Sequence, residues 1–175
     1  LGIAMVLNQA SAFFPNICRM SQWSSDRQRR YKLGRFWSTG IICTVIGLNP
    51  SYADDRTDDP TNRRLIALLS GLGYGGYWLV NLLPNVTPYP AQLGQVGKRF
   101  SSLNKKAVWQ SINESQVIIF AWGSTGAKYA HRRQIYEMVQ QPMCFGVTRL
   151  GEPRHPLYLP SYSILEPFVL RNGCK

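Results

Sequence analysis

The feature that most constrains the fold is a repeated alternation of short apolar segments with helix-like segments. Four apolar segments predict strands, at 41–46, 77–80, 117–121 and 143–147. Helical patterns separate them, at 61–72, 102–114 and 126–140. This alternation is typical of a parallel sheet with helices on both faces. The sequence therefore predicts a three-layer α/β/α fold with a central four-stranded parallel sheet.

The first predicted helix has clear signals at both ends. Asp59 is a typical N-cap residue, and Pro60 suits the first helical position, where no backbone N–H is needed. Gly73 follows the last apolar residue and suits the end of a helix. We therefore expect this helix to begin and end close to these residues.

One domain accounts for the whole chain. The length of 175 residues matches a single domain, and 45% apolar with 17% charged residues favours a packed core over disorder. We predict a single α/β domain over 1–175. Within it, 1–35 form a basic N-terminal extension with an edge strand, and 149–175 form an extended, proline-containing tail.

Composition argues against several classes of protein. No apolar run approaches the ~20 residues of a membrane-spanning helix, and no basic segment precedes the apolar start, so we expect neither a membrane protein nor a secretory signal. Two histidines make a zinc site improbable. The four cysteines lack C-x-x-C spacing, so we expect free thiols in the cytoplasm: Cys18, Cys43, Cys144 and Cys174.

The charge of the chain indicates a polyanionic partner. Twenty Lys and Arg against nine Asp and Glu give +11, which favours DNA or a nucleotide as ligand. Residues 19–35 hold six basic residues with interleaved aromatics, and alternation at 30–33 predicts a strand with one solvated, basic face. Two alternatives remain: an edge strand protected by its charges, or phosphate binding by Arg29, Arg30 and Lys32.

Polar residues follow each predicted strand. In an open parallel sheet, ligands bind beyond the carboxyl ends of the strands. Asn49, Asn81, Ser124 and His155 occupy the loops at these ends, so we expect them to converge. Taken singly, each has a structural explanation as a turn, capping or surface residue.

Four motifs resemble those of the uracil-DNA glycosylase superfamily. They are GLNPS (47–51), LVNLLP (79–84), FAWGSTGAK (120–128) and RHPL (154–157), in the superfamily's order across about 41–160. The phrases LNPS, DDPTNRR, GYGG, VNLLPNVTP, AWG and HPLYLP also resemble an uncharacterised family of bacterial and phage proteins, over roughly 30–160. The narrower resemblance implies no established activity.

The superfamily resemblance implies roles for individual residues. Asn49 would orient the hydrolytic water without acting as a base, Asn81 would read the edge of a flipped base, and His155 would stabilise negative charge on the departing base. The base pocket would include Gly47, Pro50, Ser51 and Tyr52. Contacts to the DNA backbone would come from the basic strand and from Ser124, Lys128 and Arg154.

The sequence departs from the superfamily at two positions. Ser51 stands where the uracil-specific branch has a Tyr that excludes 5-methyl groups, with Tyr52 one residue later. Leu157 replaces the first Ser of the superfamily's His-Pro-Ser motif, a residue that helps to grip the phosphate backbone. The resemblance therefore implies room for 5-substituted pyrimidines and a weaker grip on DNA.

A cluster of acidic residues has no counterpart in the glycosylase motifs. Grouped carboxylates suit Mg²⁺, whereas capping of the helix and pairing with Arg56, Arg63 or Arg64 explain the cluster without a metal. We favour the structural explanation and predict no metal. The cluster consists of Asp54, Asp55, Asp58 and Asp59.

The leading hypothesis is a DNA glycosylase-like enzyme. It would hydrolyse the N-glycosidic bond of a flipped pyrimidine, including a 5-substituted one, without a cofactor. The alternative is a non-catalytic module of the same fold that binds a nucleotide or modified nucleic acid. A third hypothesis is another transformation of a nucleotide that uses the Asp cluster with a metal.

Overall fold

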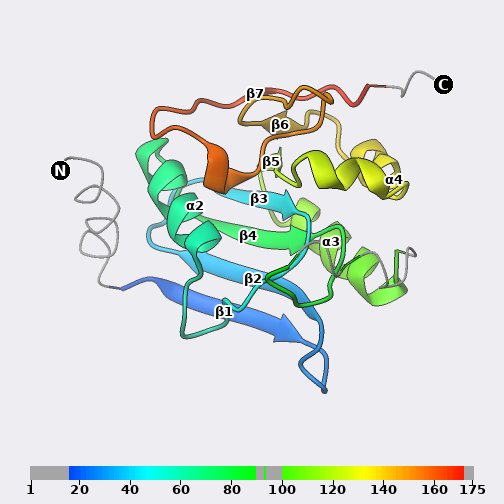
Figure 1. Cartoon of the computed structure of the whole chain (residues 1–175). Helices are drawn as coiled ribbons and strands as arrows, with labels where there is room; N and C mark the ends of the chain where they lie inside the picture. The colour runs from blue at the N-terminus through cyan, green and yellow to red at the C-terminus, as the bar shows by residue number, and fades with distance from the viewer. Residues whose placement is uncertain (1–15, 90–92, 94–99, 172–175) are drawn as a thin grey trace.

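A single mixed sheet forms the centre of the protein (Figure 1). The computed structural model describes residues 16–89, 93 and 100–171. In the described residues the sheet has seven strands, in the order β1-β2-β4-β3-β5-β6-β7. The strands are β1 Cys18–Trp23, β2 Arg30–Phe36, β3 Ile42–Gly47, β4 Gly76–Asn81, β5 Val117–Phe120, β6 Met143–Cys144 and β7 Glu166–Pro167. The helices are α2 Pro60–Gly71, α3 Ser102–Asn113 and α4 Arg132–Glu137, with 3-10 turns η2 Ser124–Lys128 and η3 Pro156–Tyr158.

The four predicted strands are present, but they do not form the whole sheet. β4, β3, β5 and β6 are adjacent and mutually parallel. β2 adds antiparallel to β4, β1 to β2, and β7 to β6. The prediction of a four-stranded parallel sheet is therefore wrong, because a hairpin and a strand from the tail extend it at both edges. The fold is α/β with a mixed sheet.

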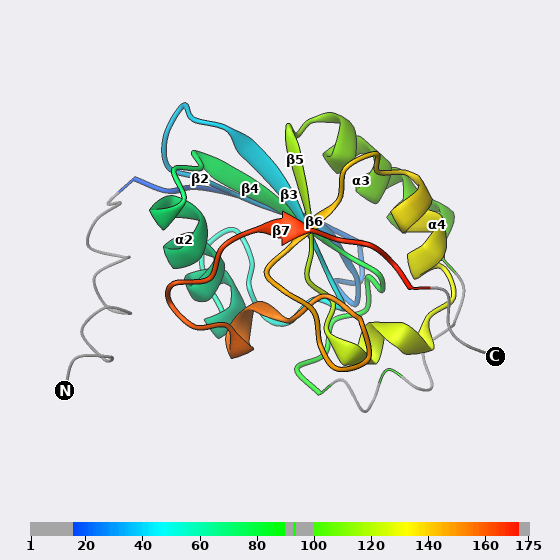
Figure 2. The same cartoon turned by 90° about the horizontal axis from the view of Figure 1, so that it is seen from above.

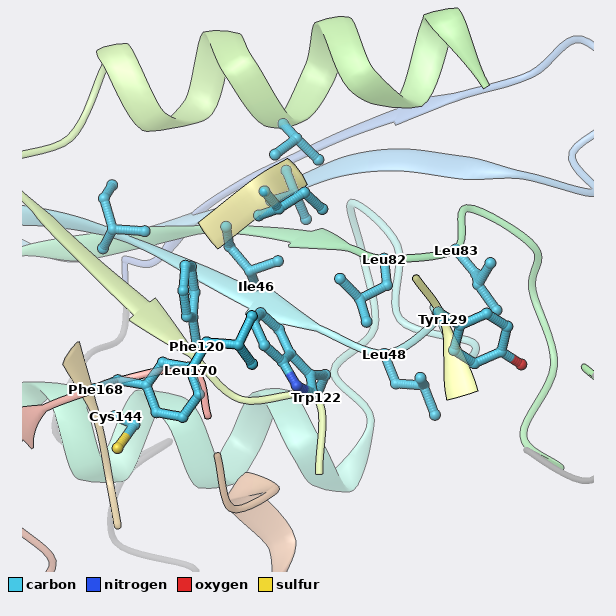
Figure 3. Close-up of a cluster of buried hydrophobic side chains, with 14 of the residues drawn as sticks. Ile46, Leu48, Leu82, Leu83, Phe120, Trp122, Tyr129, Cys144, Phe168 and Leu170 are labelled. Carbon is cyan, nitrogen blue, oxygen red and sulfur yellow. The ribbon is translucent and has the colours of Figure 1, made fainter. Parts of the chain in front are cut away.

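Helices cover both faces of the sheet. α2 lies on one face, and α3 and α4 lie on the other (Figure 2). Side chains alternate between the faces along β3, as the two-residue period of a strand requires. Cys43 and Val45 belong to the core under α2, whereas Ile46 belongs to the core under α3. Figure 3 shows the second core, in which Trp122 packs against Phe120.

The ends of α2 agree with the sequence signals. The Asp59 side chain accepts a hydrogen bond from the Asn62 backbone N–H at 2.8 Å, and Pro60 begins the helix. Gly73 adopts φ +82°, a conformation that side chains disfavour. Asp59 is therefore an N-cap, as predicted.

The helix predicted over 126–140 is interrupted. It divides into η2 and α4, and Tyr129 and His131 lie in the segment between them. Both side chains are buried, with 6% and 4% exposure. Residues two apart point to opposite sides of a continuous helix. The break is what lets both rings enter the core.

The basic strand is buried rather than solvated. β2 lies between β1 and β4, and Arg30 and Arg35 are 1% and 0% exposed. Lys32 is also buried; its ammonium lies 2.5 Å from Glu114 and 3.7 Å from the centre of the Trp78 ring. The prediction of a solvated edge strand is therefore wrong, because β1 covers β2 and protein groups surround its charges.

The two ends of the chain lie partly outside the described residues. Residues 1–15 and 172–175 are among those not described, so the predicted N-terminal extension is visible only from 16 onwards. The tail contributes η3 and β7. No helix in the described part of the chain has the length and apolar character needed to cross a membrane.

Contact between Gly126 and the Trp122 ring yields a first prediction. A Cβ at Gly126 would overlap the buried indole. Gly126→Ala should therefore lower the free energy of unfolding by about 1–3 kcal/mol, as overpacking does. Gly71→Ala is the control, since nothing lies within 4 Å of its Cβ, and it should stabilise α2 by about 0.5–1 kcal/mol. Urea denaturation measures both, and equal stability of the two variants would contradict this packing.

Candidate functional site

Two loops at the carboxyl ends of adjacent strands are joined by backbone hydrogen bonds. The N–H groups of Leu82 and Leu83, after β4, donate to carbonyls at Gly47 and Leu48, each at 2.9 Å. These bonds continue the parallel pairing of β3 with β4 beyond the strands. They fix the loop that carries Asn49 against the loop that follows Asn81.

A cleft of about 930 Å³ opens at this edge of the sheet. Asn49 and His155 both line it, as do Asp58, Arg63 and Arg154. Below it lies a small chamber of about 30 Å³, lined by Arg30, Gly47 and Asn81 among others. Six residues line both spaces: Leu48, Asn49, Ser51, Asp59, Thr61 and His155.

Asn49 is held by both of its amide protons. Its Nδ2 donates to the carbonyl oxygens of Pro50 at 2.9 Å and Thr87 at 2.7 Å. The side-chain oxygen is then the atom available to a ligand, and it can only accept a hydrogen bond. Asn49 can therefore orient a water molecule or an N–H group but cannot take up a proton.

His155 presents a neutral imidazole with one N–H. Its Nδ1 accepts a hydrogen bond from the Leu157 backbone N–H at 3.3 Å, so the ring proton resides on Nε2. Burial lowers the pKa of His155 below its ordinary value, and the Asp59 carboxylate opposes this shift only in part. His155 is therefore neutral at pH 7 and offers Nε2–H as a donor.

A buried carboxylate positions the segment before His155. Glu152 accepts hydrogen bonds from the Trp122 indole at 2.7 Å and from the Arg132 Nε at 3.1 Å. The Gly123 backbone N–H donates to the Pro153 carbonyl at 2.9 Å. These bonds tie the loop after β5 to the loop that carries His155.

Asn81 lies one layer deeper than predicted. It is 3% exposed and lines the chamber rather than the cleft, and its Nδ2 has no hydrogen-bond partner among the described residues. Gly47 pairs with it across the strands, and a Cβ at Gly47 would lie 2.7 Å from Asn81 Oδ1. Glycine at this position therefore leaves room for the amide.

Arg30 enters the chamber from the neighbouring strand. Its backbone N–H donates to the Pro84 carbonyl at 2.9 Å, which fixes the start of β2 beside the loop after β4. Nη1 donates to the Ala53 carbonyl at 2.6 Å, and Nε has no hydrogen-bond partner in the part of the chain that the structure describes. Burial lowers the pKa of Arg30 to about 10, so the guanidinium still carries its charge at pH 7.

The remaining predicted site residues divide between the cleft and the surface. Ser51, Tyr52, Ser124 and Arg154 line the cleft, in addition to Asn49 and His155. Pro50 lines neither space; its carbonyl accepts from Asn49. Among the other predicted phosphate-binding residues, Arg30 lines the chamber. Arg29 and Lys128, which are exposed, and Lys32, which is buried, line neither the cleft nor the chamber.

The acidic cluster has structural partners. Asp54 caps a turn by accepting from the backbone N–H groups of Arg56 and Thr57, each at 2.8 Å. Asp58 forms ion pairs with Arg19 at 3.0 Å and Arg35 at 2.6 Å, rather than with the arginines predicted to pair with the cluster. The described residues contain no group of three side chains able to hold a metal ion.

Sequence reasoning missed the positions of Asp59 and Arg30 in the site. Asp59 is 9% exposed and lines both the cleft and the chamber besides capping α2. Capping of α2 was a sufficient explanation for Asp59 in the sequence, and the alternation around Arg30 predicted a solvated face. No local signal shows that β2 and α2 begin beside the same chamber, because hydrogen bonds between distant segments create that arrangement.

The lowered pKa of His155 predicts a pH dependence of stability. Between about pH 7.5 and pH 5 the unfolded chain gains a proton on this histidine more readily than the folded one, so the free energy of unfolding should fall on acidification. His155→Gln should reduce that fall. Urea denaturation at both pH values measures it, and the same fall in wild type and variant would contradict the burial of the ring.

The part of the chain that builds the site matches a known protein family. Residues 30–157 match the model of a family described as Protein of unknown function (DUF1643). No curated protein and no solved structure matches the chain. The matched stretch runs from Arg30, at the start of β2, to Leu157, in η3, and so includes every strand and loop that lines the chamber. The chain therefore belongs to the DUF1643 family.

Proposed function

We propose that this protein is a glycosylase-like enzyme that hydrolyses the N-glycosidic bond of a flipped pyrimidine in DNA. One observation carries the proposal. The acceptor oxygen of Asn49 and the donor Nε2–H of His155 line the same cleft, and the buried amide of Asn81 lines the chamber at its floor. This reaction needs a hydrogen-bond acceptor for the water, a neutral donor to the base and a group that recognises the edge of the base.

Each group has a distinct part in the reaction. Asn49 accepts a hydrogen bond from a water molecule and directs its oxygen at the sugar carbon C1′. When the C1′–N bond breaks, its electron pair leaves with the base, and His155 Nε2–H donates to a base oxygen on which negative charge develops. Asn81 meets the far edge of the base through the floor of the cleft.

The dimensions and surroundings of the cleft suit a nucleotide. A volume of about 930 Å³ lies within the range of small-molecule sites and accommodates a base with its sugar and phosphate. Arg154 and Ser124 at the cleft, and the net charge of +11, support contact with a phosphate backbone. Ser51, a small residue in the lining, leaves space for a substituent on C5 of the base.

The resemblance of the four motifs to those of the uracil-DNA glycosylase superfamily supports this proposal. In its favour, Asn49 follows β3, Asn81 is the last residue of β4 and His155 precedes η3, in the order that the motifs imply. We also propose that the fold has the three-layer arrangement of the uracil-DNA glycosylase superfamily.

A second candidate is a non-catalytic module that binds a nucleotide or modified nucleic acid. It is favoured by the chemistry of Asn49, which cannot accept a proton from water. Asp58 and Asp59 in the cleft lining also weaken attraction to a phosphate backbone. In this case the same three residues would contribute only to affinity.

Single substitutions separate the two candidates. His155→Ala should lower kcat by about 10²–10³-fold with little change in base affinity, because its donor acts mainly in the transition state. Asn49→Ala should also lower kcat, whereas Asn81→Ala should weaken binding of the base itself. Single-turnover rates and binding constants on the same oligonucleotide distinguish the three effects.

The opposite pattern would favour the binding module. There, His155→Ala and Asn81→Ala would both reduce affinity, and no turnover would exist to lose. Ser51→Tyr adds an independent check on the pocket: it should reduce the processing or binding of 5-substituted pyrimidines more than that of unsubstituted ones.

Salt dependence tests the contact with DNA. Among the predicted phosphate-binding residues, Arg30 and Lys32 are buried and the exposed Arg29 lies 4.0 Å from Asp26, so Arg154 and Lys128 are the informative ones. If both contact phosphates, replacing both by Ala should make the slope of log K against log salt less negative by about 1.8, at 0.9 per contact. Lys105→Ala on α3 is the control for a change in net charge. An unchanged slope would exclude these contacts.

A further inference from the structure

Two buried arginines of β2 differ in how their charges are compensated. The Arg35 guanidinium forms an ion pair with Asp58 at 2.6 Å and donates to the carbonyls of Asp54 at 2.6 Å and Gly34 at 2.8 Å. Arg30 is equally buried, but within the described residues its guanidinium donates one hydrogen bond, to the Ala53 carbonyl. The Nε–H of Arg30 has no partner there.

The charge of Arg30 is incompletely compensated. Among the described residues no carboxylate lies within 4.0 Å of its guanidinium, and the Trp23 ring lies 5.9 Å away. The Asp59 carboxylate is the charge that most opposes the lowering of the pKa of Arg30, and one of its oxygens already accepts two hydrogen bonds from Asn62. A buried cation without an ion pair is costly to a fold. Such a cost is expected where the charge serves a ligand.

The unpaired donor of Arg30 and that of Asn81 line the same chamber. Arg30 Nε and Asn81 Nδ2 are both buried, and neither has a partner among residues 16–89, 93 and 100–171. The volume of about 30 Å³ holds a water molecule or a single exocyclic oxygen but not an aromatic ring. The chamber is therefore built to receive one acceptor atom from a ligand whose ring remains in the cleft.

We propose that Arg30 and Asn81 form an oxyanion subsite for the departing base. The inference rests on the proposed function. As the C1′–N bond breaks, its electron pair passes to the base, and the negative charge spreads through the ring to a carbonyl oxygen held in the chamber. The water oxygen bonds to C1′, its released proton passes to solvent, and the base anion is protonated on release. Arg30 supplies the positive charge at this oxygen, and His155 Nε2–H donates at the cleft.

Stability distinguishes this role from a structural one. Arg30→Met removes an uncompensated charge and should leave Tm within about 3 °C of wild type or raise it. Arg35→Met, the matched control on the same strand, leaves Asp58 without its closest ion-pair partner and should lower Tm by about 10 °C. Equal losses of Tm in the two variants would overturn the proposal, because Arg30 would then hold the fold together as Arg35 does.

Binding of a free base measures the subsite without any turnover. The probe is 5-fluorouracil, titrated calorimetrically below and above the pH at which its ring N–H ionises. Arg30→Met should weaken binding of the ionised base at least about tenfold more than binding of the neutral base. Arg30→Lys retains the charge and should restore part of that preference. Equal weakening of both forms, or no binding of either form by wild type, would overturn the proposal.

Turnover separates failure of the subsite from failure of the proposed function. If wild type cleaves DNA, Arg30→Met should lower kcat most for bases that are poor leaving groups. Cleavage with an unchanged dependence on the leaving group would overturn the subsite and leave the glycosylase intact. If wild type cleaves nothing, the proposed hydrolysis is wrong, whereas a lost preference for the ionised base in Arg30→Met would still support the subsite.

Discussion

Parallel pairing of β3 with β4 on one side and β5 on the other is the constraint on which the site depends. It brings three strand ends to one edge, and the hydrogen bonds that follow Gly47 and Asn81 extend that pairing into the loops. Because both faces of these strands are buried, their register is fixed by packing. The loops have little freedom, which is what a preorganised cleft requires.

The buried charged side chains of this protein differ in how far other protein groups compensate their charges. Asp58 joins Arg19 and Arg35, and Glu152 joins Trp122 and Arg132, so these charges are compensated and hold segments together. The guanidinium of Arg30 has an Nε without a partner among the described residues, and it lines the chamber next to the cleft. In the proposed oxyanion subsite, an electron-rich atom of the ligand would complete the surroundings of this guanidinium.

The sequence allowed prediction of some of this architecture but not all of it. β3, β4 and β5 were predicted to within about one residue because they are apolar throughout, and α2 because Asp59 and Gly73 mark its ends. The burial of β2 was missed because the groups that contact its charged side chains, such as Asp58 for Arg35 and Glu114 for Lys32, are distant in sequence. Asn49 and His155 were expected to converge, and they do; the depth of Asn81 and the place of Arg30 depend on tertiary contacts that no local pattern encodes.

The proposed hydrolysis of a glycosidic bond can be tested by incubating wild-type protein with single-stranded and duplex oligonucleotides that each carry one altered or unaltered base, and then counting abasic sites. We expect abasic sites at one or more pyrimidines, dependent on His155 and independent of added metal. Intact DNA across the whole set, together with tight binding of a nucleotide, would contradict it and leave the binding module as the function of the cleft.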